Sequence, residues 1–361
     1  MRPVTIVLYG ATGYTGRLVA NELARRGLDH VLSGRDEGKL ARLADEHKAP
    51  ARAAQLDDNA ALRDLLDGAS VVINCAGPFT LAGDALVRAA IATRTHYVDS
   101  TGEQPFIRMV FDRHDRGAQR AGVALVSGLG FDYAPGDCLA RLAAQGLEPL
   151  EEMVLAYDVD GFGMSRGTLR SALEAMKGGD VIYRDERWQP TPGGISRASF
   201  DFPEPLGRRP VSRYPSGEVI TVPHHTRTRA VTSLITTTTV APLPLLAPLL
   251  PYVMPGLALT LRTPLRGLLA KLVRVLPEGP SEESRREAKF TVVALARALD
   301  GNTRRGVLRG SDVYGLTAVT LAHGAELLSA PGYQGAGALA PAAAFDPAAF
   351  LDAVGLRWEV G

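Results

Sequence analysis

The sequence predicts a two-domain α/β fold, in which an N-terminal doubly wound parallel sheet precedes an α+β region with a mostly antiparallel sheet. Three observations predict it. Short apolar runs alternate with segments of helical length through the first third of the chain, which is typical of β-α-β units. The segment from Val4 to Gly16 places a glycine series between the first such run and the first amphipathic segment. Beyond Glu151, apolar and polar side chains alternate, which indicates an antiparallel sheet. We therefore predict a Rossmann domain followed by an α+β domain.

Bulk composition is that of a globular protein with a sizeable core. The chain has 361 residues, of which 46% are hydrophobic and 22% are charged, and its net charge of +1 indicates no nucleic-acid partner. Cys75 and Cys138 lie far apart, and His224 and His225 would point to opposite faces of a strand, so no metal site is predicted. Because the sequence starts directly on the first strand, we expect a cytoplasmic protein without a targeting peptide.

The glycine series has the spacing G-x-x-G-x-x-G. Gly10 allows a tight turn, Gly13 lets the backbone approach a pyrophosphate, and Gly16 brings the helix close to the strand. The free N–H groups and the helix dipole then face the phosphates. The predicted nucleotide-binding residues of this turn are Gly10, Ala11, Thr12, Gly13, Tyr14, Thr15 and Gly16.

The second strand predicts which dinucleotide is bound. An NAD site usually has a carboxylate at the tip of this strand, but here the tip is Ser33-Gly34-Arg35. The Arg35 guanidinium would pair with a 2′-phosphate, and Lys39 lies one helical turn further on. We therefore favour NADP(H) over NAD(H), with Ser33, Gly34, Arg35 and Lys39 at the cofactor. Asp36 is expected to cap the following helix.

Two more strand ends are predicted to contact the cofactor. Asp57 follows a weak strand and either reaches the adenine or caps the next helix. The buried strand from Val71 runs into a turn of small residues, and ligands bind at the carboxyl ends of strands in such sheets. The predicted contacts in this turn are Cys75, Ala76, Gly77 and Pro78.

Two reaction types are disfavoured by missing residues. A short-chain dehydrogenase needs Tyr-x-x-x-Lys, and none of the ten tyrosines has a lysine four positions on. An acyl-phosphate or semialdehyde reductase needs an activated cysteine, but Cys138 directly follows Asp137, whose charge opposes a thiolate.

The glycine-rich segment from Gly128 to Asp137 marks the expected domain boundary. We predict a Rossmann domain over residues 1–130, an α+β substrate or dimerisation domain over residues 131–340, and a tail over residues 341–361 that returns to the Rossmann domain or the cleft. Strands are expected at Glu218–Val222 and Thr228–Val240, and a hairpin around Asp300-Gly301-Asn302.

The stretch from Ala230 to Leu261 carries no charge, and residues up to Leu276 remain rich in leucine. Five prolines argue against a membrane-spanning helix, because each removes a backbone donor. Four interpretations stay open: core, pocket wall, homodimer face, or peripheral contact with a membrane surface.

Several motifs together resemble one family. GATGYTG, SGR, INCAGPF, THYVDSTGE and GFDYAPGD, in this order, resemble the saccharopine dehydrogenase-like oxidoreductases. MSRGTLRSALE, EGPSEESRR and DVYGLTA resemble the branch that includes trans-acting enoyl reductases of bacterial lipid and polyketide synthesis. The resemblance implies an NAD(P)-binding Rossmann domain, a second α+β domain and a cleft between them. Ser165-Arg166-Gly167-Thr168 departs from the familiar Ser-Gly-Gly-Thr, and Phe131-Asp132-Tyr133 departs from Phe-Asp-Ser.

The expected activity is hydride transfer between NADPH and a small or acyl, lipid-like substrate. Tyr133 and Tyr97 are the candidate proton donors, and Asp99 is the third candidate catalytic residue. The predicted residues of the substrate cleft are Glu103, Asp132, Ser165 and Arg166. Each of the carboxylates could instead cap a helix or stabilise a turn.

Two alternatives remain. The enzyme could reduce an amino acid or imine, as saccharopine reductases do, with Arg166 and Arg170 binding carboxylates. It could also be a non-catalytic NADP(H)-binding protein at a membrane or in an assembly.

Overall fold

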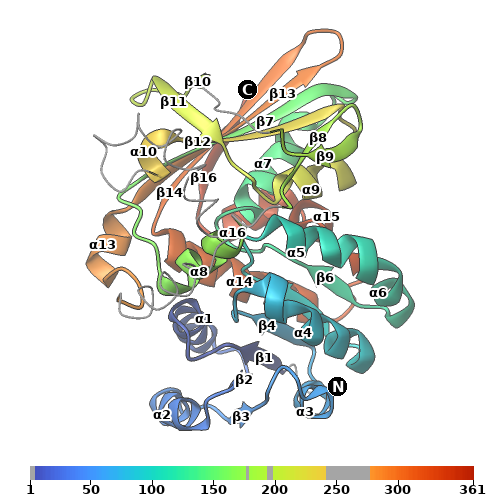
Figure 1. Cartoon of the computed structure of the whole chain (residues 1–361), viewed down its shortest axis with the longest axis vertical. Coiled ribbons are helices and arrows are strands. Elements are labelled where there is room, and N and C mark those ends of the chain that lie inside the picture. The colour runs from blue at the N-terminus through green and yellow to red at the C-terminus, as the bar shows by residue number, and fades with distance from the viewer. Residues whose placement is uncertain (1–4, 176–178, 193–197, 241–276) are drawn as a thin grey trace. The chain divides into compact units, whose positions relative to one another are not determined.

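The computed structural model describes residues 5–175, 179–192, 198–240 and 277–361, which form two compact units (Figure 1). Unit 1 comprises Met1–Ala134 and Tyr314–Asp346, and unit 2 comprises Pro135–Val313 and Pro347–Gly361. Unit 1 is built on a parallel sheet and unit 2 on a mixed, mostly antiparallel sheet, so the predicted fold class is confirmed.

Unit 1 contains a seven-stranded parallel sheet of order β15-β6-β5-β4-β1-β2-β3. Its elements are β1 (Ile6–Tyr9), α1 (Tyr14–Arg25), β2 (His30–Gly34), α2 (Glu37–His47), β3 (Ala51–Ala53), α3 (Asn59–Leu66), β4 (Val71–Asn74), α4 (Phe79–Thr93), β5 (His96–Asp99), α5 (Gln104–Met109), the π-helix η1 (Val110–His114), α6 (Asp115–Ala121), β6 (Ala124–Val126), α14 (Val313–Ser329), β15 (Gly337–Ala338) and α15 (Pro341–Ala344).

The order of the strands reverses between β1 and β4, which lie side by side although two strands separate them in the sequence. Tyr9 at the end of β1 is in register with Asn74 at the end of β4. Such a reversal opens a crevice at the carboxyl ends of the strands, where doubly wound folds bind ligands. The topology therefore puts the glycine turn after β1 next to the small-residue turn after β4.

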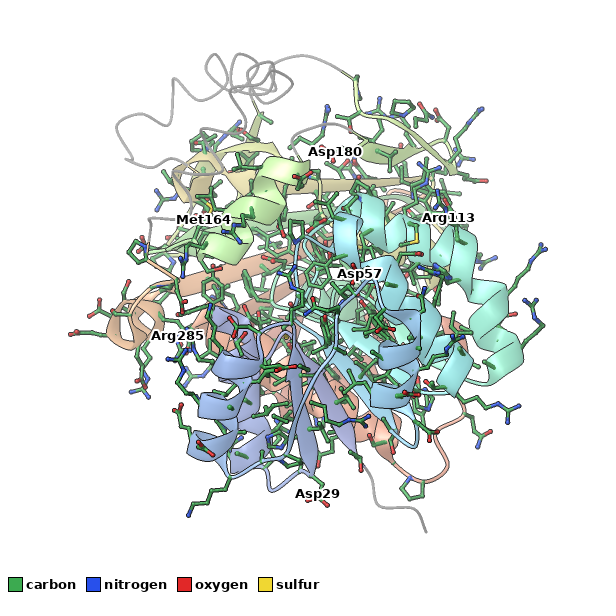
Figure 2. All side chains as sticks on the ribbon, turned by 60° about the horizontal axis from the view of Figure 1, so that its bottom comes forward. Asp29, Asp57, Arg113, Met164, Asp180 and Arg285 are labelled. Carbon is green, nitrogen blue, oxygen red and sulfur yellow. The ribbon has the colours of Figure 1, made fainter. Side chains whose placement is uncertain are left out.

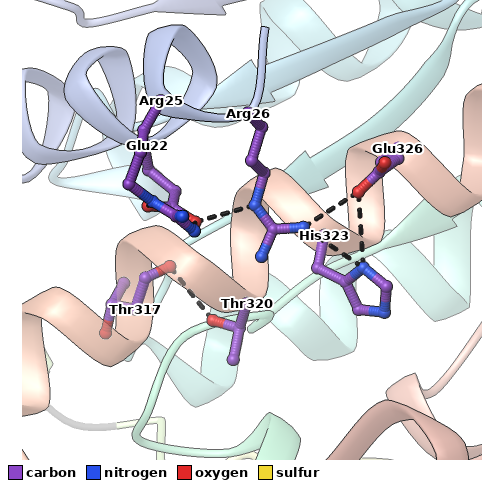
Figure 3. Close-up of polar contacts among 7 residues, drawn as sticks. All are labelled: Glu22, Arg25, Arg26, Thr317, Thr320, His323 and Glu326. Carbon is purple, nitrogen blue, oxygen red and sulfur yellow. Dashed lines mark hydrogen bonds and ion pairs between the residues drawn. The ribbon is translucent and has the colours of Figure 1, made fainter. Parts of the chain in front are cut away.

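Helices cover both faces of this sheet. Helices α3, α4, α5 and α6 pack together, with α4 in contact with the other three. Their side of the core contains fully buried aromatic side chains, including those of Tyr97 and Phe106. On the other side, polar contacts join the C-terminal end of α1 to α14 (Figure 3). Arg26 Nη1 donates to Glu326 Oε2 at 2.9 Å, and Arg26 Nε donates to the largely buried Glu22 at 2.7 Å.

Unit 2 contains a nine-stranded sheet, in which β12 and β7 pair in parallel and the other pairs are antiparallel. Its elements are α7 (Ala134–Ala144), β7 (Leu150–Asp160), α8 (Arg166–Ala175), β8 (Val181–Arg184), β9 (Arg187–Pro190), β10 (Ala198–Asp201), β11 (Arg208–Arg213), α9 (Glu218–Thr221), the 3-10 helix η2 (Val222–His224), β12 (Ala230–Thr236), α10 (Thr237–Val240), α13 (Glu282–Glu287), β13 (Lys289–Ala298), β14 (Thr303–Ser311), α16 (Pro347–Ala353) and β16 (Arg357–Val360). Strands β13 and β14 form the hairpin that Asp300-Gly301 predicts, with Gly301 at φ +87°.

The strand expected at Glu218–Val222 is wrong, because these residues form α9 and the start of η2. One helical turn places Glu218 and Thr221 on the same side, whereas residues three apart on a strand face opposite ways. Glu218 then contacts the Tyr157 hydroxyl, and Thr221 Oγ1 donates to Asp137 Oδ1 at 2.6 Å. These buried partners on β7 and α7 select the helical turn.

The strand expected at Thr228–Val240 is correct over β12 but ends at Thr236, where α10 begins. The Thr239 hydroxyl both accepts from Val159 N and donates to Val159 O, each at 2.9 Å. A side chain that bonds the main chain in this way competes with the ladder hydrogen bonds of a sheet.

The division into units differs from the predicted boundaries, since residues 314–346 lie in unit 1 and residues 347–361 in unit 2. Strand β15 pairs with β6, and Thr320 Oγ1 donates to Leu129 O at 2.7 Å. The last strand, β16, pairs with β14. Residues 241–276, which contain most of the predicted uncharged stretch, lie outside the described residues. No helix among the described residues is long and apolar enough to cross a membrane.

Candidate cofactor and active site

The glycine turn after β1 is packed against the turn after β4. Gly10 has φ +82°, and a Cβ atom there would lie 2.8 Å from Ala76 N and 2.9 Å from the carbonyl carbon of Cys75. A Cβ atom at Gly16 would lie 2.1 Å from Gly10 O, so only glycine lets α1 approach the turn. Gly13 differs, because its φ is −75° and its nearest neighbour, Gly10 O, would be 3.3 Å away. Gly10 and Gly16 are therefore required by the fold, whereas the exposed Gly13 has only one close neighbour for a Cβ atom.

Helices α1, α2 and α3 differ in whether a carboxylate caps their N-terminus, which affects anion binding. The Asp36 carboxylate accepts from Lys39 N and so caps α2, as predicted. The α3 cap is Asp58, which accepts from Ala60 N and Ala61 N. Helix α1 has Gly13 at its N-cap, with no side-chain cap and no acidic residue in its first turn. The positive end of the α1 dipole is therefore not neutralised by a carboxylate in its first turn.

The predicted adenosine contacts at the tips of β2 and β3 are exposed side chains. Arg35 is exposed, and the described residues hold no carboxylate in an ion pair with it. Lys39 Nζ lies 3.7 Å from Asp36, so part of its charge is compensated. Asp57 is exposed beyond the end of β3, at the opposite end of the sheet from Asp29 (Figure 2). The cap of α3 is Asp58 rather than Asp57, and the contact of Asp57 with the adenine stays a prediction.

Ser33, a predicted cofactor residue, makes a hydrogen bond within the sheet. Its hydroxyl is buried and donates to Arg52 O on β3 at 2.7 Å. Gly34 pairs with Ala53 in the same ladder. Of the remaining residues of the glycine turn, Ala11 and Thr12 precede α1, and Tyr14 and Thr15 begin it. Arg17 Nη1 donates to Thr12 O at 2.8 Å.

The turn after β4 is shaped by a side chain that sequence reasoning missed. Asn74 Oδ1 accepts from Ala76 N at 3.0 Å, and Asn74 Nδ2 donates to the Tyr97 hydroxyl at 3.0 Å. Burial raises the pKa of the Cys75 thiol to about 12, so this cysteine is no thiolate nucleophile at neutral pH. The signal for Asn74 was a polar residue that ends an otherwise apolar strand.

The two candidate proton donors hold internal bonds. The Tyr133 hydroxyl donates to Gly102 O at 2.6 Å, and its side chain is buried. Tyr97 is fully buried between Asn74 and Asp99, and desolvation raises its pKa well above 10. The bond to Gly102 O favours a structural role for the Tyr133 hydroxyl, and the assignment of Tyr97 as a proton donor remains a prediction.

Asp99 is the last residue of β5, and Asp132 lies in the turn that follows the neighbouring strand β6. Asp99 Oδ1 accepts from Thr101 N and from Gly128 N, both at 2.9 Å, and burial raises the pKa of this carboxyl to about 6. Burial likewise raises the pKa of Asp132 to about 6. Groups that titrate near neutral pH are suited to proton transfer. The predicted place of Asp132 in the substrate cleft stays a prediction.

Of the other predicted cleft residues, Glu103 lies in unit 1 and two lie in unit 2. The Glu103 carboxylate is fully buried and bonds the first residues of α4. Ser165 Oγ accepts from Thr168 N at 3.1 Å at the start of α8. Arg166 Nη2 pairs with Glu278 Oε1 at 2.8 Å. Each of these side chains therefore has a structural partner within its own unit. Among the described residues there is no cluster that could hold a metal ion.

Comparison with known proteins matches the unit 1 part of this site to a family model. Residues 6–126 match the family described as saccharopine dehydrogenase NADP binding domain, which confirms the predicted cofactor, NADP(H). The matched range contains the glycine turn, Arg35 and the turn after β4.

Three relatives show how far the similarity extends. The chain is 28% identical to a human saccharopine dehydrogenase-like oxidoreductase over 196 residues, which are 48% of this chain and 46% of that protein. It is 34% identical to a trans-acting enoyl reductase of Mycobacterium ulcerans over 143 residues, 38% of this chain and 34% of that protein. It is 29% identical to a lipid droplet localized protein of Caenorhabditis elegans over 191 residues, 48% of this chain and 45% of that protein. The match thus spans about half the length of these relatives or less.

A solved structure extends the similarity of fold to the second unit. The apo saccharopine dehydrogenase (L-Glu forming) of Saccharomyces cerevisiae is similar with a TM-score of 0.65 and 15% identity, over 99% of this chain and 100% of that chain. At this identity the likeness concerns the fold alone.

Proposed function

We propose, from the premise that residues 6–126 belong to the saccharopine dehydrogenase NADP-binding family, that this protein is an NADP-dependent oxidoreductase. Two features at the carboxyl ends of the unit 1 strands support the proposal. Helix α1 starts at a glycine turn without a side-chain cap, and the Arg35 guanidinium is exposed at the tip of the neighbouring strand. The first feature suits a pyrophosphate and the second a 2′-phosphate.

The residues of unit 1 divide the work of holding the cofactor. The N-terminus of α1 binds the pyrophosphate, and Arg35 pairs with the 2′-phosphate. Lys39 contributes less, because Asp36 already lies 3.7 Å from its ammonium group. The turn from Cys75 to Pro78 lines the nicotinamide half, since its backbone touches Gly10. Bound NADPH supplies a hydride, and the chain must orient the acceptor and provide a proton.

For the substrate we propose an acyl, lipid-like molecule with an α,β-unsaturated thioester. The names of two relatives, an enoyl reductase and a lipid droplet localized protein, support this class. Reduction would add a hydride to the β-carbon and a proton to the α-carbon, which gives the saturated acyl chain. An amino acid substrate would need a cation for its carboxylate. Of the two predicted candidates, Arg166 is paired with Glu278, whereas Arg170 is exposed on α8.

The amino acid or imine substrate is the second candidate, because the fold of unit 1 and unit 2 together resembles the yeast saccharopine dehydrogenase. A panel containing an enoyl thioester, a keto thioester and a cyclic imine separates the candidates by the rate of NADPH oxidation. Turnover of the enoyl thioester is expected. Turnover of the imine alone would overturn the acyl proposal, and NADPH binding without any turnover would favour a non-catalytic nucleotide-binding protein.

The cofactor assignment is tested by titrating NADPH and NADH against the protein and against Arg35→Ala. Losing a charge-assisted phosphate contact should weaken NADPH binding by roughly tenfold or more and leave NADH binding nearly unchanged. Arg63→Ala is the matched control, because Arg63 is an exposed arginine on α3 with no predicted cofactor contact. Equal affinities for the two dinucleotides, unaffected by Arg35→Ala, would contradict the role of this residue.

A further inference from the structure

Helix α4 begins on a carboxylate that comes from another part of the chain. The N-cap of α4 is Pro78, which has no side-chain hydrogen bond to offer. Instead, Glu103 Oε1 accepts from Phe79 N at 2.8 Å, and Glu103 Oε2 accepts from Thr80 N at 2.7 Å. The Thr80 hydroxyl also donates to Glu103 Oε2. Three donors in the first turn of α4 are therefore bound by one buried side chain.

Glu103 is itself fixed by its neighbours. It is fully buried and is the N-cap of α5, where its carbonyl oxygen accepts from Phe106 N at 2.9 Å. Its own N–H donates to Thr101 Oγ1 at 3.0 Å, and Thr101 N donates to Asp99 Oδ1 at 2.9 Å. A chain of hydrogen bonds thus runs from the end of β5 through Glu103 to the start of α4.

Packing strengthens the same junction. The rings of Phe79 and Phe106 lie 5.8 Å apart, and both side chains are buried. A Cβ atom at Gly83 would lie 2.4 Å from the Phe106 ring, so α4 rests closely on α5. The first turn of α4 has little room to move relative to Glu103.

The junction is directly continuous with the turn from Cys75 to Pro78, which ends where α4 begins. At its other end this turn touches Gly10 and is tied by Asn74 to Ala76 N. Glu103 is thus the side chain that holds the far end of the turn, whereas Asn74 holds the near end. We propose that Glu103 is a positioning residue for the nicotinamide half of the cofactor, acting through the main chain of residues 75–80. This inference rests on the proposed function, because it assumes that NADPH binds at this edge of the sheet.

The arrangement also explains why α4 is unlike α1. Both helices follow strands that meet at the reversal of the sheet, and both N-termini would attract an anion. The Glu103 carboxylate already occupies that role at α4, whereas α1 has no acidic residue in its first turn. The phosphates are thereby directed to α1, and the turn before α4 is left for the uncharged end of the cofactor.

The test separates the two halves of the cofactor. Adenosine 2′,5′-bisphosphate carries the adenosine and the 2′-phosphate without nicotinamide, and NADPH fluorescence reports the surroundings of the nicotinamide. In Glu103→Gln one carboxylate oxygen becomes an amide N–H₂, which cannot accept a hydrogen bond. Either Phe79 N or Thr80 N therefore loses its acceptor. We expect NADPH binding to weaken roughly tenfold with a reduced fluorescence enhancement, while the affinity for adenosine 2′,5′-bisphosphate stays within about twofold.

Two further variants keep the inference falsifiable. Thr80→Val removes only the hydroxyl bond to Glu103 and should shift NADPH binding in the same direction by a smaller factor. Ser281→Ala removes a comparable cap, that of α13 in unit 2, and should leave both ligands unaffected. If either Glu103→Gln or Thr80→Val, while folded, weakened both ligands by the same factor or neither ligand, the inference would be overturned and the proposed function would stand. No binding of either ligand to the unsubstituted protein would overturn both.

Discussion

Gly10 and Ala76 are in backbone contact across the reversal of the unit 1 sheet, since a Cβ atom at Gly10 would lie 2.8 Å from Ala76 N. The glycine turn and the turn after β4 therefore behave as one surface. A substitution in the first turn that moves the backbone will also move the second.

The three glycines of the motif should respond differently to alanine. Gly10→Ala forces a side chain into φ +82° and against Ala76, so we expect a loss of stability of roughly 2–4 kcal/mol. Gly13→Ala has an ordinary φ of −75° and should cost less than about 1 kcal/mol. Gly13 is exposed, and an added methyl group would lie 3.3 Å from Gly10 O, so NADPH binding should be lost although the fold is kept. Chemical denaturation and NADPH titration measure the two effects. Equal losses of stability in both variants would contradict this division.

Tyr133→Phe distinguishes a structural tyrosine from a proton donor. The hydroxyl is bound to Gly102 O at 2.6 Å within a buried environment. We expect the variant to lose about 1–2 kcal/mol of stability and to keep its rate of substrate reduction within about threefold. Thermal melting and steady-state kinetics provide the two numbers. A rate that falls by roughly a hundredfold or more, with an unchanged melting temperature, would instead identify the phenol as the general acid.

Glu218 should make the stability of unit 2 depend on pH. Desolvation raises the pKa of this carboxyl from 4.5 to about 8, despite the Tyr157 and Ser216 hydroxyls beside it, and the nearby Asp137 adds to the rise. The folded state therefore binds more protons than the unfolded state between these values. Stability is fully present below about pH 4.5 and decreases as pH rises towards 8, by up to roughly 1.4 kcal/mol for each pH unit.

Glu218→Gln should flatten this decrease, because the amide stays neutral at every pH. Urea denaturation at a series of pH values measures the slope. Glu282→Gln, on the exposed surface of α13, is the control and should leave the slope unchanged. A Glu218→Gln variant with the same slope as the unsubstituted protein would show that this carboxyl does not titrate in the range.

The ion pair between α1 and α14 should contribute little by itself (Figure 3). The Glu326 side chain is 46% exposed, so its coupling to Arg26 in a double-mutant cycle should stay below about 1 kcal/mol and decrease with salt. Arg26→Met should cost more than Glu326→Gln, because Arg26 also pairs with Glu22, whose side chain is 9% exposed. Equal costs for the two single variants would argue against the importance of the buried partner.

Local patterns were enough to predict much of unit 1. Strand–turn–helix alternation identified the elements up to β6, and Asp36 was correctly assigned as the cap of α2. The turn Asp300-Gly301 correctly predicted the hairpin of unit 2. In each case the residues that determine the structure are adjacent in the sequence.

The features that escaped prediction depend on distant partners. The helical turn at Glu218 exists because Tyr157 and Asp137 lie beneath it, and neither is near it in the sequence. The bond from Phe79 N to Glu103 joins residues 24 positions apart. From its sequence context Glu103 was assigned to the substrate cleft, with a helix cap as the alternative, and its side chain caps the preceding helix of the chain.

The pairing of β15 with β6 has a consequence for biosynthesis. Residues 337–338 complete the edge of the unit 1 sheet, and residues 357–360 complete the edge of the unit 2 sheet. As the chain leaves the ribosome, the glycine turn emerges first, but β6 remains an open edge while the whole of β7 to β14 is made. A chain released before residue 337 contains neither unit in complete form. Unit 1 therefore cannot be completed before β7 to β14 of unit 2 have been made, because its edge strand β15 follows them in the chain.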